Sequence, residues 1–231
     1  STLMEPINGQ KHYTEKLIKL SNSGQCYEQP KISIERNENK EKIIFFNLQN
    51  LFKLLPDEDQ IYIDIIKNIK NCEIWFMKAR NTRSTEFFIS RLYNIFEKNN
   101  LDIEQYIKFK KRRSQKEFFK LINKSDIIID SLNWSGNNTS HQAIALAKPI
   151  ITLPGPFMRS RHTYALLKQI NINETIAKNR EDYIKIAIKL SKDKDYYIKL
   201  INRIEKNNNL LFNDESPIRE LEDILIKLIK K

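Results

Sequence analysis

Short apolar runs alternate with segments of helical periodicity from about residue 42 onwards, and this alternation constrains the fold more than any other feature of the sequence. The runs are rich in isoleucine and phenylalanine, which is typical of strands buried on both faces of a sheet. They occupy residues 42–46, 73–77, 106–110, 126–130 and 150–153, and helical segments separate them over residues 57–70, 84–98, 114–124 and 141–148. This strict alternation predicts an α/β fold, a parallel sheet with helices on both faces, whose ligands bind beyond the carboxyl ends of the strands.

Further helical segments are expected on either side of this region. One covers residues 12–20 and precedes a polar, proline-bearing linker, and three follow the last strand over residues 158–169, 180–193 and 196–206. The C-terminal segment from Pro217 is amphipathic, and its apolar side is formed by Ile218, Leu221, Ile224, Leu225 and Leu228. Such a stripe favours a helix that faces a core over a membrane anchor.

Composition excludes several classes of protein. With 40% hydrophobic residues among 231, the chain has enough apolar side chains for a sizeable core. It lacks the run of roughly eighteen apolar residues that a membrane span needs, and its N-terminus does not resemble a signal peptide, so we expect a cytoplasmic protein without a membrane partner. Cys26 and Cys72 have neither disulfide-framework nor metal-site spacing.

The net charge of +11 raises the possibility of a nucleic-acid partner. Lysines are scattered along every segment, however, together with abundant Asn and Ile, which indicates a compositional bias more than a designed basic patch. We therefore expect no nucleic-acid partner. A basic nucleic-acid binder stays as a third alternative, which predicts salt-sensitive retention of DNA or RNA.

A polar turn lies between the last two predicted strands. It contains Ser135, Gly136, Asn137, Asn138, Thr139 and Ser140 and leads directly into a helical segment. The first N–H groups of a helix lack partners and carry partial positive charge, so a phosphate is a natural ligand at such a turn. The same residue types are also common helix caps, and this alternative stays open.

Three segments together resemble the O-GlcNAc transferase/SPINDLY family, particularly its bacterial members with TPR repeats: QNLFKLLP at 49–56, DSLNWSGNNTSHQAIALAKPIITLPGPFMRSRH at 130–162 and AKNREDYIKIAIKL at 177–190. Residues 3–20 resemble the segment that joins the two halves of those enzymes. The resemblance implies a GT-B architecture of two Rossmann-like lobes, of which this chain matches the C-terminal, donor-binding lobe. It also implies sugar transfer from a nucleotide diphosphate to Ser or Thr of a protein, with no metal and no other cofactor.

The resemblance divides the chain into three parts. Residues 1–41 are expected to be a linker and the trailing end of a preceding catalytic lobe, residues 42–206 the Rossmann-like nucleotide-sugar-binding lobe, and residues 207–231 a C-terminal amphipathic helix. An N-terminal TPR and catalytic lobe, on the same or a neighbouring gene product, is the expected partner. We expect the chain alone to be incomplete and inactive.

The same resemblance assigns site residues. Lys53 matches the lysine that stabilises the diphosphate, and it follows Gln49 in the loop after the first strand. Asn137, Asn138 and Thr139 match the phosphate-binding turn, with Ser135, Gly136 and Ser140 beside them. The stretch from Arg113 through Gln115 to Phe118 matches the wall of the base pocket.

Each assignment has a plainer alternative. A surface lysine is ordinarily solvated, and Phe118 also belongs to a helical stripe that would simply face the sheet. Gln142 departs from the family, whose members usually carry an acid there to accept hydrogen bonds from ribose, and an amide oxygen accepts them more weakly. Arg159 or Arg161 could face the cleft, and His162 is expected to be structural.

The sequence thus predicts the donor-binding half of an inverting, metal-independent protein O-glycosyltransferase, with GlcNAc from UDP-GlcNAc as the expected donor sugar. UDP-glucose and GDP-fucose are not distinguished from it. The alternative is a degenerate, non-catalytic GT-B lobe that serves binding or regulation, which the neutral Gln142 favours.

Overall fold

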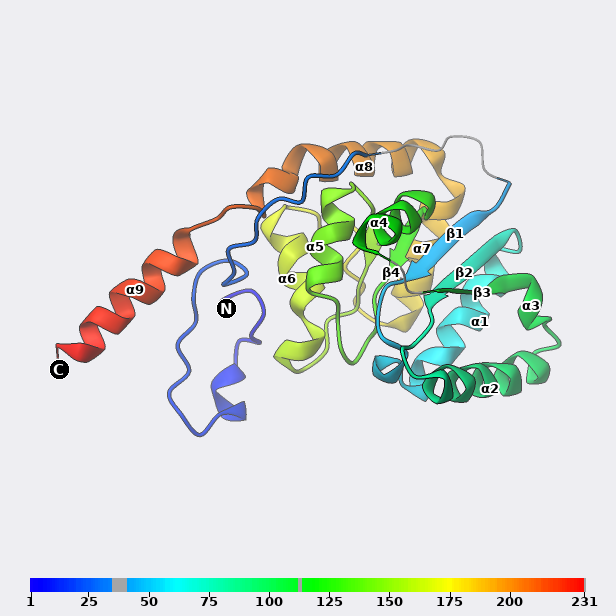
Figure 1. Cartoon of the computed structure of the whole chain (residues 1–231), viewed down its shortest axis with the longest axis horizontal. Helices are drawn as coiled ribbons and strands as arrows, with labels where there is room; N and C mark the ends of the chain where they lie inside the picture. Colours follow the sequence, from blue (N-terminus) through cyan, green and yellow to red (C-terminus); the bar gives the residue numbers. More distant parts are fainter. Residues whose placement is uncertain (35–40, 112–113, 231) are drawn as a thin grey trace.

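The computed structural model describes residues 1–34, 41–111 and 114–230, so Arg113 lies outside the described residues. The described part of the chain contains a five-stranded, fully parallel sheet in the order β3-β2-β1-β4-β5 (Figure 1). The strands are β1 Ile43–Asn47, β2 Cys72–Met77, β3 Ile107–Lys110, β4 Ile127–Ile129 and β5 Ile150–Ile151. The predicted parallel sheet is therefore confirmed.

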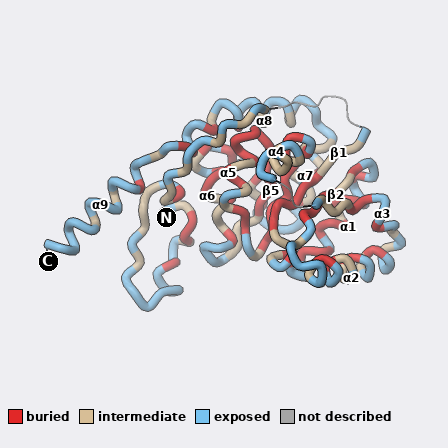
Figure 2. Tube along the Cα trace, viewed as in Figure 1, coloured by how far each residue is buried: buried red, intermediate tan, exposed pale blue. Residues whose placement is uncertain are grey.

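Helices connect and extend the strands. The α-helices are α1 Asp59–Asn68, α2 Thr82–Lys98, α3 Ile103–Tyr106, α4 Gln115–Lys124, α5 Asn138–Ala145, α6 His162–Gln169, α7 Arg180–Lys192, α8 Lys194–Asn207 and α9 Ser216–Ile229. Short 3-10 helices are η1 Gly9–His12, η2 Leu51–Lys53, η3 Pro56–Glu58, η4 Met158–Ser160 and η5 Asn208–Leu210. The buried positions gather in the sheet and in α1, α5 and α6 (Figure 2).

Aromatic contacts show which helices cover each face of the sheet. Neighbouring residues of a strand point to opposite faces, and the register of β1 with β2 places Phe46 and Phe76 on opposite sides. Phe76 packs edge-on against Tyr62 of α1 and Phe88 of α2, with ring centroids 5.1 Å away in each case. Phe46 packs edge-on against Phe118 of α4 at 6.4 Å. Helices therefore cover both faces, as predicted.

The strand order creates a crevice at one end of the sheet. From β1 the chain proceeds outwards to β2 and β3, then returns to place β4 and β5 on the other side of β1. The loops that follow β1 and β4 consequently lead away from each other. At such a topological switch point the loops leave an open site at the carboxyl ends of the strands.

The helix predicted over residues 12–20 is wrong. Residues 13–20 are non-helical, and only η1 precedes them. The amide of Gln10 donates to the carbonyl of Glu15 and accepts from the N–H of Leu17, each at 2.8 Å, so a side chain satisfies this backbone instead of a helical ladder. The segment is largely exposed, and a short helix without a packed apolar face is marginal in water.

The core-facing stripe predicted for the C-terminal helix is also wrong in this structure. Helix α9 leaves the body of the lobe (Figure 1), and Ile218, Leu221, Leu225 and Leu228 are exposed. The N-terminal part of α9 is attached to the N-terminal segment of the chain, because a carboxylate oxygen of Glu220 accepts from the backbone N–H of Ser21 at 2.6 Å. The predicted division at residues 41 and 206 stays a prediction.

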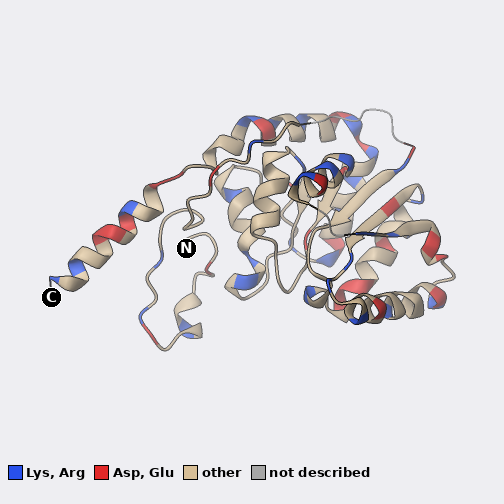
Figure 3. Cartoon of the chain, viewed as in Figure 1, with Lys and Arg blue, Asp and Glu red and all other residues tan. Residues whose placement is uncertain are grey.

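Lys and Arg residues are interspersed with Asp and Glu residues along the ribbon of the lobe (Figure 3). Within the described ranges, no helix combines the length and the apolar character needed to cross a bilayer.

Candidate functional site

A cavity of about 830 Å³ lies at the switch point, between the loop after β1 and the turn after β4. Its lining is Leu48, Gln49, Asn50, Lys53, Met77, Arg80, Gln115, Phe118, Trp134, Ser135, Asn137, Asn138, Thr139, Gln142 and His162. The structure therefore gathers nine of the predicted donor-binding residues around one space: Gln49, Lys53, Gln115, Phe118, Ser135, Asn137, Asn138, Thr139 and Gln142. Gly136 and Ser140 do not line it, and Arg113 lies outside the described residues.

The first turn of α5 is uncapped. Asn137 occupies the N-cap position, but no side chain accepts a capping hydrogen bond there, and the first turn contains no acidic residue. The backbone ladder begins only at His141, whose N–H donates to the carbonyl of Asn137 at 2.9 Å. The simple capping alternative therefore has no support in the described contacts. The free N–H groups and the helix dipole leave partial positive charge at the cavity wall.

A hydroxyl network behind the cavity holds this turn in place. The N–H of Thr163 donates to Oγ of Ser135 at 2.8 Å, the hydroxyls of Thr163 and Ser140 lie 2.8 Å apart, and Oγ1 of Thr163 donates to the carbonyl of Gly136 at 3.1 Å. All of these groups are buried. Ser140 and Gly136 thus support the turn from α6 rather than face the cavity.

Gly136 lies in close contact with the side chains around it. A Cβ atom there would clash with Oγ of Ser140 and would lie 2.7 Å from Nε2 of Gln49. A residue with a side chain would therefore require the side chains of Ser140 and Gln49 to move.

Asp130, directly after β4, holds the turn before α5 in place. Its carboxylate accepts from the N–H of Gly136 at 2.8 Å and from the hydroxyl of Thr152 at 2.9 Å. Burial raises the pKa of Asp130 to about 6, although these hydrogen bonds act in the opposite direction. This role of Asp130 was not predicted from the sequence. The position of an aspartate directly after a buried strand was the available signal.

Lys53, at the end of η2, stands opposite the turn. Its Nζ donates to Oε1 of Gln49 at 3.3 Å and lies 5.1 Å from the ring centroid of Trp134. Gln49 in turn donates through Nε2 to Oγ1 of Thr139 at 3.3 Å. Burial lowers the pKa of Lys53, and the nearby Asp130 partly offsets this. A continuous series of contacts thus connects the α5 turn to Lys53 and Trp134, so Lys53 is not simply a solvated surface lysine.

Phe118 of α4 and Gln142 of α5 are two further predicted residues that line the cavity. Phe118 is half-buried and both lines the cavity and packs on Phe46 of the sheet, so the two alternatives for its ring are compatible. Gln142 is one helical turn beyond Asn138 on α5 and also lines the cavity. The lining of the cavity thus includes an aromatic ring and a side-chain amide besides the phosphate-type turn.

The predicted cleft-facing arginines do not line the cavity. Nε of Arg161 donates to the carbonyl of Met4 at 3.0 Å, and its guanidinium lies over the ring of Tyr164. The guanidinium of Arg159 stacks on Phe157 at 4.6 Å. These contacts tie η4 and α6 to their surroundings.

Arg80, Met77, Trp134 and His162 line the cavity instead and were not assigned to it from the sequence. Met77 ends β2 and Arg80 follows it, so the rule that ligands bind beyond the carboxyl ends of parallel strands could have found both. His162 begins α6, and burial, reinforced by the charge of Lys53, lowers its pKa.

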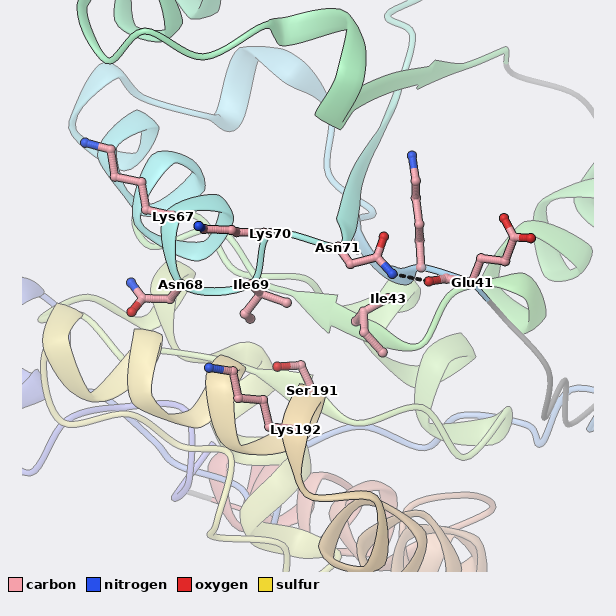
Figure 4. A pocket seen from close by; sticks show the side chains of 10 residues that line it. Glu41, Ile43, Lys67, Asn68, Ile69, Lys70, Asn71, Ser191 and Lys192 are labelled. Carbon is pink, nitrogen blue, oxygen red and sulfur yellow. Dashed lines mark hydrogen bonds between the residues drawn. The ribbon is translucent and has the colours of Figure 1, made fainter.

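A second cavity of about 550 Å³ lies at the amino-terminal end of β1 (Figure 4). Lys67 and Lys192 lie in the last turns of α1 and α7, where a cation complements the negative end of the helix dipole. Lys67 also donates to Oδ1 of Asn99 at 2.6 Å, and Lys42 pairs with Glu73. The helix ends and these partners therefore account for Lys42, Lys67 and Lys192 without a ligand. No group of three or more His, Cys, Asp or Glu side chains in the described segments is arranged to hold a metal ion.

The fold and the position of the cavity define a Rossmann-like lobe of the kind that forms one half of a GT-B fold. Residues 6–220 match the sequence profile of glycosyl transferase family 41, and the chain belongs to that family. The family resemblance stated from the sequence is thereby confirmed.

Individual relatives agree with this membership. The UDP-N-acetylglucosamine–peptide N-acetylglucosaminyltransferase of Caenorhabditis elegans is 22% identical over 191 residues, which are 82% of this chain and 16% of that protein. A probable enzyme of the same kind, SPINDLY of Eustoma exaltatum, is 24% identical over 200 residues, 82% of this chain and 21% of that protein. The chain thus spans about a fifth of the length of the curated relatives it matches.

Solved structures share the fold. A mutant of the O-GlcNAc transferase of Thermobaculum terrenum superposes with a TM-score of 0.83 at 21% identity, over 96% of this chain and 43% of that one. HepE of Anabaena, solved in complex with UDP and glucose, superposes with a TM-score of 0.60 at 12% identity, over 80% of this chain and 48% of that one. The chain corresponds to one lobe of these proteins.

Proposed function

We propose that this lobe binds the nucleotide-sugar donor of an inverting, metal-independent protein O-glycosyltransferase. In the whole enzyme it would act with an N-terminal TPR and catalytic lobe to transfer a sugar, GlcNAc from UDP-GlcNAc, to Ser or Thr hydroxyls of cytoplasmic proteins. The names of its relatives, which are UDP-N-acetylglucosamine–peptide N-acetylglucosaminyltransferases, support this choice of donor.

One observation carries the proposal, namely that the uncapped first turn of α5 faces a half-buried lysine across the cavity. A departing diphosphate without a metal must be neutralised by backbone N–H groups, hydroxyls and a cation. The α5 turn supplies the N–H groups, Thr139 a hydroxyl and Lys53 the cation. Phe118 and Gln115 would then border the base, and Gln142 the ribose.

Titration calorimetry with UDP and with uridine, in the presence of EDTA, tests this function through Lys53. We expect Lys53→Ala to weaken UDP binding by a factor of roughly ten or more, because it removes a charge-assisted contact worth about 1.5 to 3 kcal/mol, and to leave uridine binding unchanged. Lys70→Ala is the matched control, since Lys70 lines the second cavity. Equal losses for UDP and uridine would contradict the assignment of Lys53, and UDP binding that EDTA abolishes would contradict metal independence.

A degenerate lobe that binds nucleotides without turnover is the second candidate, and the neutral Gln142 at the ribose end of the cavity favours it. The two candidates agree on nucleotide binding. They differ on catalysis once a companion lobe is present.

A further inference from the structure

His141 is a buried polar side chain in the first turn of α5, and the proposed function does not use it. Its Nδ1 lies 3.0 Å from the carbonyl oxygen of Asn137. A carbonyl only accepts hydrogen bonds, so Nδ1 carries the proton and donates. Nε2 is then left as a buried acceptor, and it has no hydrogen-bond partner among the described residues.

Two segments far apart in the sequence enclose this imidazole. The ring of Tyr27, from the N-terminal segment, stacks on it with centroids 4.3 Å apart and planes inclined by 19°, and the ring of Phe212, after η5, lies 6.1 Å away. The carbonyl of Tyr27 accepts from the N–H of Asn213 at 2.9 Å, which holds the two segments together. Burial lowers the pKa of His141 to about 4, although the hydrogen bond to Asn137 acts in the opposite direction, so the ring is neutral near pH 7.

Packing alone does not explain a histidine at this position. Aromatic rings surround the side chain, and a buried acceptor without a partner destabilises a fold. Leucine, which branches at Cγ as histidine does, would fill much of the same space without that loss. The nitrogen that does have a partner, Nδ1, therefore indicates the role of His141.

The hydrogen bond from Nδ1 acts on the peptide group that joins Asn137 to Asn138. The carbonyl of Asn137 accepts both the backbone N–H of His141 at 2.9 Å and Nδ1 at 3.0 Å. Because a trans peptide group is planar, fixing this carbonyl also fixes the N–H of Asn138 on its other side. That N–H has no acceptor among the described contacts, and both Asn137 and Asn138 line the cavity. A second donor to the carbonyl polarises the peptide group, so its N–H becomes a stronger donor.

We propose that His141 is a positioning residue for the donor diphosphate: it holds the peptide group between Asn137 and Asn138 so that the N–H of Asn138 donates to the diphosphate, and Tyr27 holds the imidazole in the required plane. This inference rests on the proposed function, because the diphosphate is the group that this N–H meets. Through Tyr27 it also makes the N-terminal segment a part of donor binding.

Two substitutions of nearly equal shape at position 141 test this role. Asparagine and leucine both branch at Cγ, so asparagine can place a donor nitrogen where Nδ1 lies, and leucine places a methyl group there. Titration calorimetry of the full chain gives the Kd for UDP and for uridine. We expect His141→Leu to weaken UDP binding by roughly threefold or more relative to uridine, and His141→Asn to keep the wild-type ratio within about twofold.

Melting temperatures distinguish positioning from packing. His141→Leu removes the unpaired acceptor and should melt close to the wild type or higher, whereas His141→Asn buries a new unpaired oxygen and should melt lower. The order of stability of the two variants is then the reverse of their order of UDP affinity. Ile144→Val is the control, because Ile144 is fully buried on the same helix, and its shortening should lower the melting temperature without changing the ratio of the two affinities.

Tyr27 gives a test that leaves His141 in place. If Tyr27 acts through the imidazole, Tyr27→Ala should weaken UDP binding in the wild-type background and have little further effect in His141→Leu. Tyr27→Phe keeps the stacked ring and should retain the affinity. Equal losses from Tyr27→Ala in both backgrounds would contradict this coupling.

The outcomes separate this inference from the function beneath it. If the wild-type chain binds no UDP, the proposed function fails, and His141 has no diphosphate to position. If UDP binds and His141→Leu keeps the wild-type ratio, or His141→Asn loses as much as His141→Leu, the positioning role is wrong while the proposed function stands. A UDP affinity that follows the melting temperature across the variants would make His141 a packing residue and would also overturn the inference.

Discussion

Thr139 is the residue at which the two explanations of the polar turn can be separated. Its hydroxyl lines the cavity and accepts from Gln49, whereas α5, in whose first turn it lies, has no side-chain cap to lose. We therefore expect Thr139→Val to weaken UDP binding several-fold, about 1 kcal/mol, with little change in melting temperature. Calorimetry and thermal unfolding of the same samples measure both quantities.

Asn81→Ala is the matched control for that experiment. Asn81 is a working N-cap, because its side chain accepts from the N–H of Arg83 at 2.9 Å, and its loss should cost about 1 kcal/mol of stability without affecting UDP. A Thr139→Val variant that behaves like Asn81→Ala, less stable but with full affinity, would restore the capping explanation.

Whether a site residue could be predicted from the sequence depends on how far along the chain its interaction partner lies. Gln49, Lys53 and Asn138 were foreseen together because carboxyl ends of parallel strands meet at one edge, and because a family motif marked them. Thr163 was missed, since its role depends on α6 packing against the turn 23 positions earlier at Ser140. Arg161, which could have faced the cleft, binds the carbonyl of Met4 instead, and that partner is 157 positions away.

At the scale of elements, hydrophobic periodicity predicted a helix correctly where the apolar face of that helix packs against the rest of the lobe. In α2, Thr85, Phe88, Leu92 and Phe96 are buried at helical spacing. Residues 12–20 have a comparable local preference but remain largely exposed, and the helix does not form there. The last predicted strand, 150–153, is reduced to Ile150–Ile151 plus a single bridge from Thr152 to Ile176, which the sequence pattern did not indicate.

Hydrogen bonds between η3 and the loop after β4 are made by a buried side chain, the carboxyl of Glu58. Oε1 of Glu58 accepts from the N–H groups of Leu132 and Asn133 at 3.1 and 3.4 Å. Burial raises the pKa of Glu58 from 4.5 to about 8. Between these values the folded chain binds the proton and the unfolded chain does not. The free energy of unfolding therefore falls as pH rises through this range.

Replacing Glu58 by Gln should flatten that pH dependence. The amide oxygen can still accept from the loop, and the side chain is neutral at every pH, so the fall in stability between about pH 6.5 and about 8 should shrink. Above about pH 6 Asp130 contributes little further change, because burial raises its pKa only to about 6. Urea unfolding across this window measures the slope. Glu222→Gln, an exposed partner of Arg219, is the control, and equal slopes in all three proteins would refute the prediction.

At the scale of the whole molecule, the described chain supplies one wall of a site. The α5 turn, Lys53 and the cavity around them lie at the open edge of a single parallel sheet. Sugar transfer requires the acceptor hydroxyl, its base and the anomeric carbon of the donor to be held together. In a GT-B enzyme two lobes supply these parts. The proteins that this chain resembles extend well beyond the residues that it matches.

The chain alone should therefore bind UDP weakly and transfer no sugar to protein. Binding should be tighter at low salt, because attraction between the diphosphate and Lys53 is screened by ions. Mixing the chain with an N-terminal catalytic lobe of family 41 should raise both the affinity and the transfer of GlcNAc from UDP-GlcNAc. Radiolabelled UDP-GlcNAc and a Ser/Thr-rich acceptor protein measure the transfer.

Gln142 decides between the two functions in that reconstituted mixture. If the neutral amide weakens only the ribose contact, Gln142→Glu should increase UDP-GlcNAc affinity and turnover together, because a carboxylate accepts hydrogen bonds from hydroxyls more strongly. Gln115→Glu, on α4 at the same cavity, controls for added negative charge. Turnover that stays absent in the mixture with either residue at 142, while UDP still binds, would favour the degenerate binding lobe. Protein glycosylation by the purified chain alone would overturn the assignment of the catalytic parts to a second lobe.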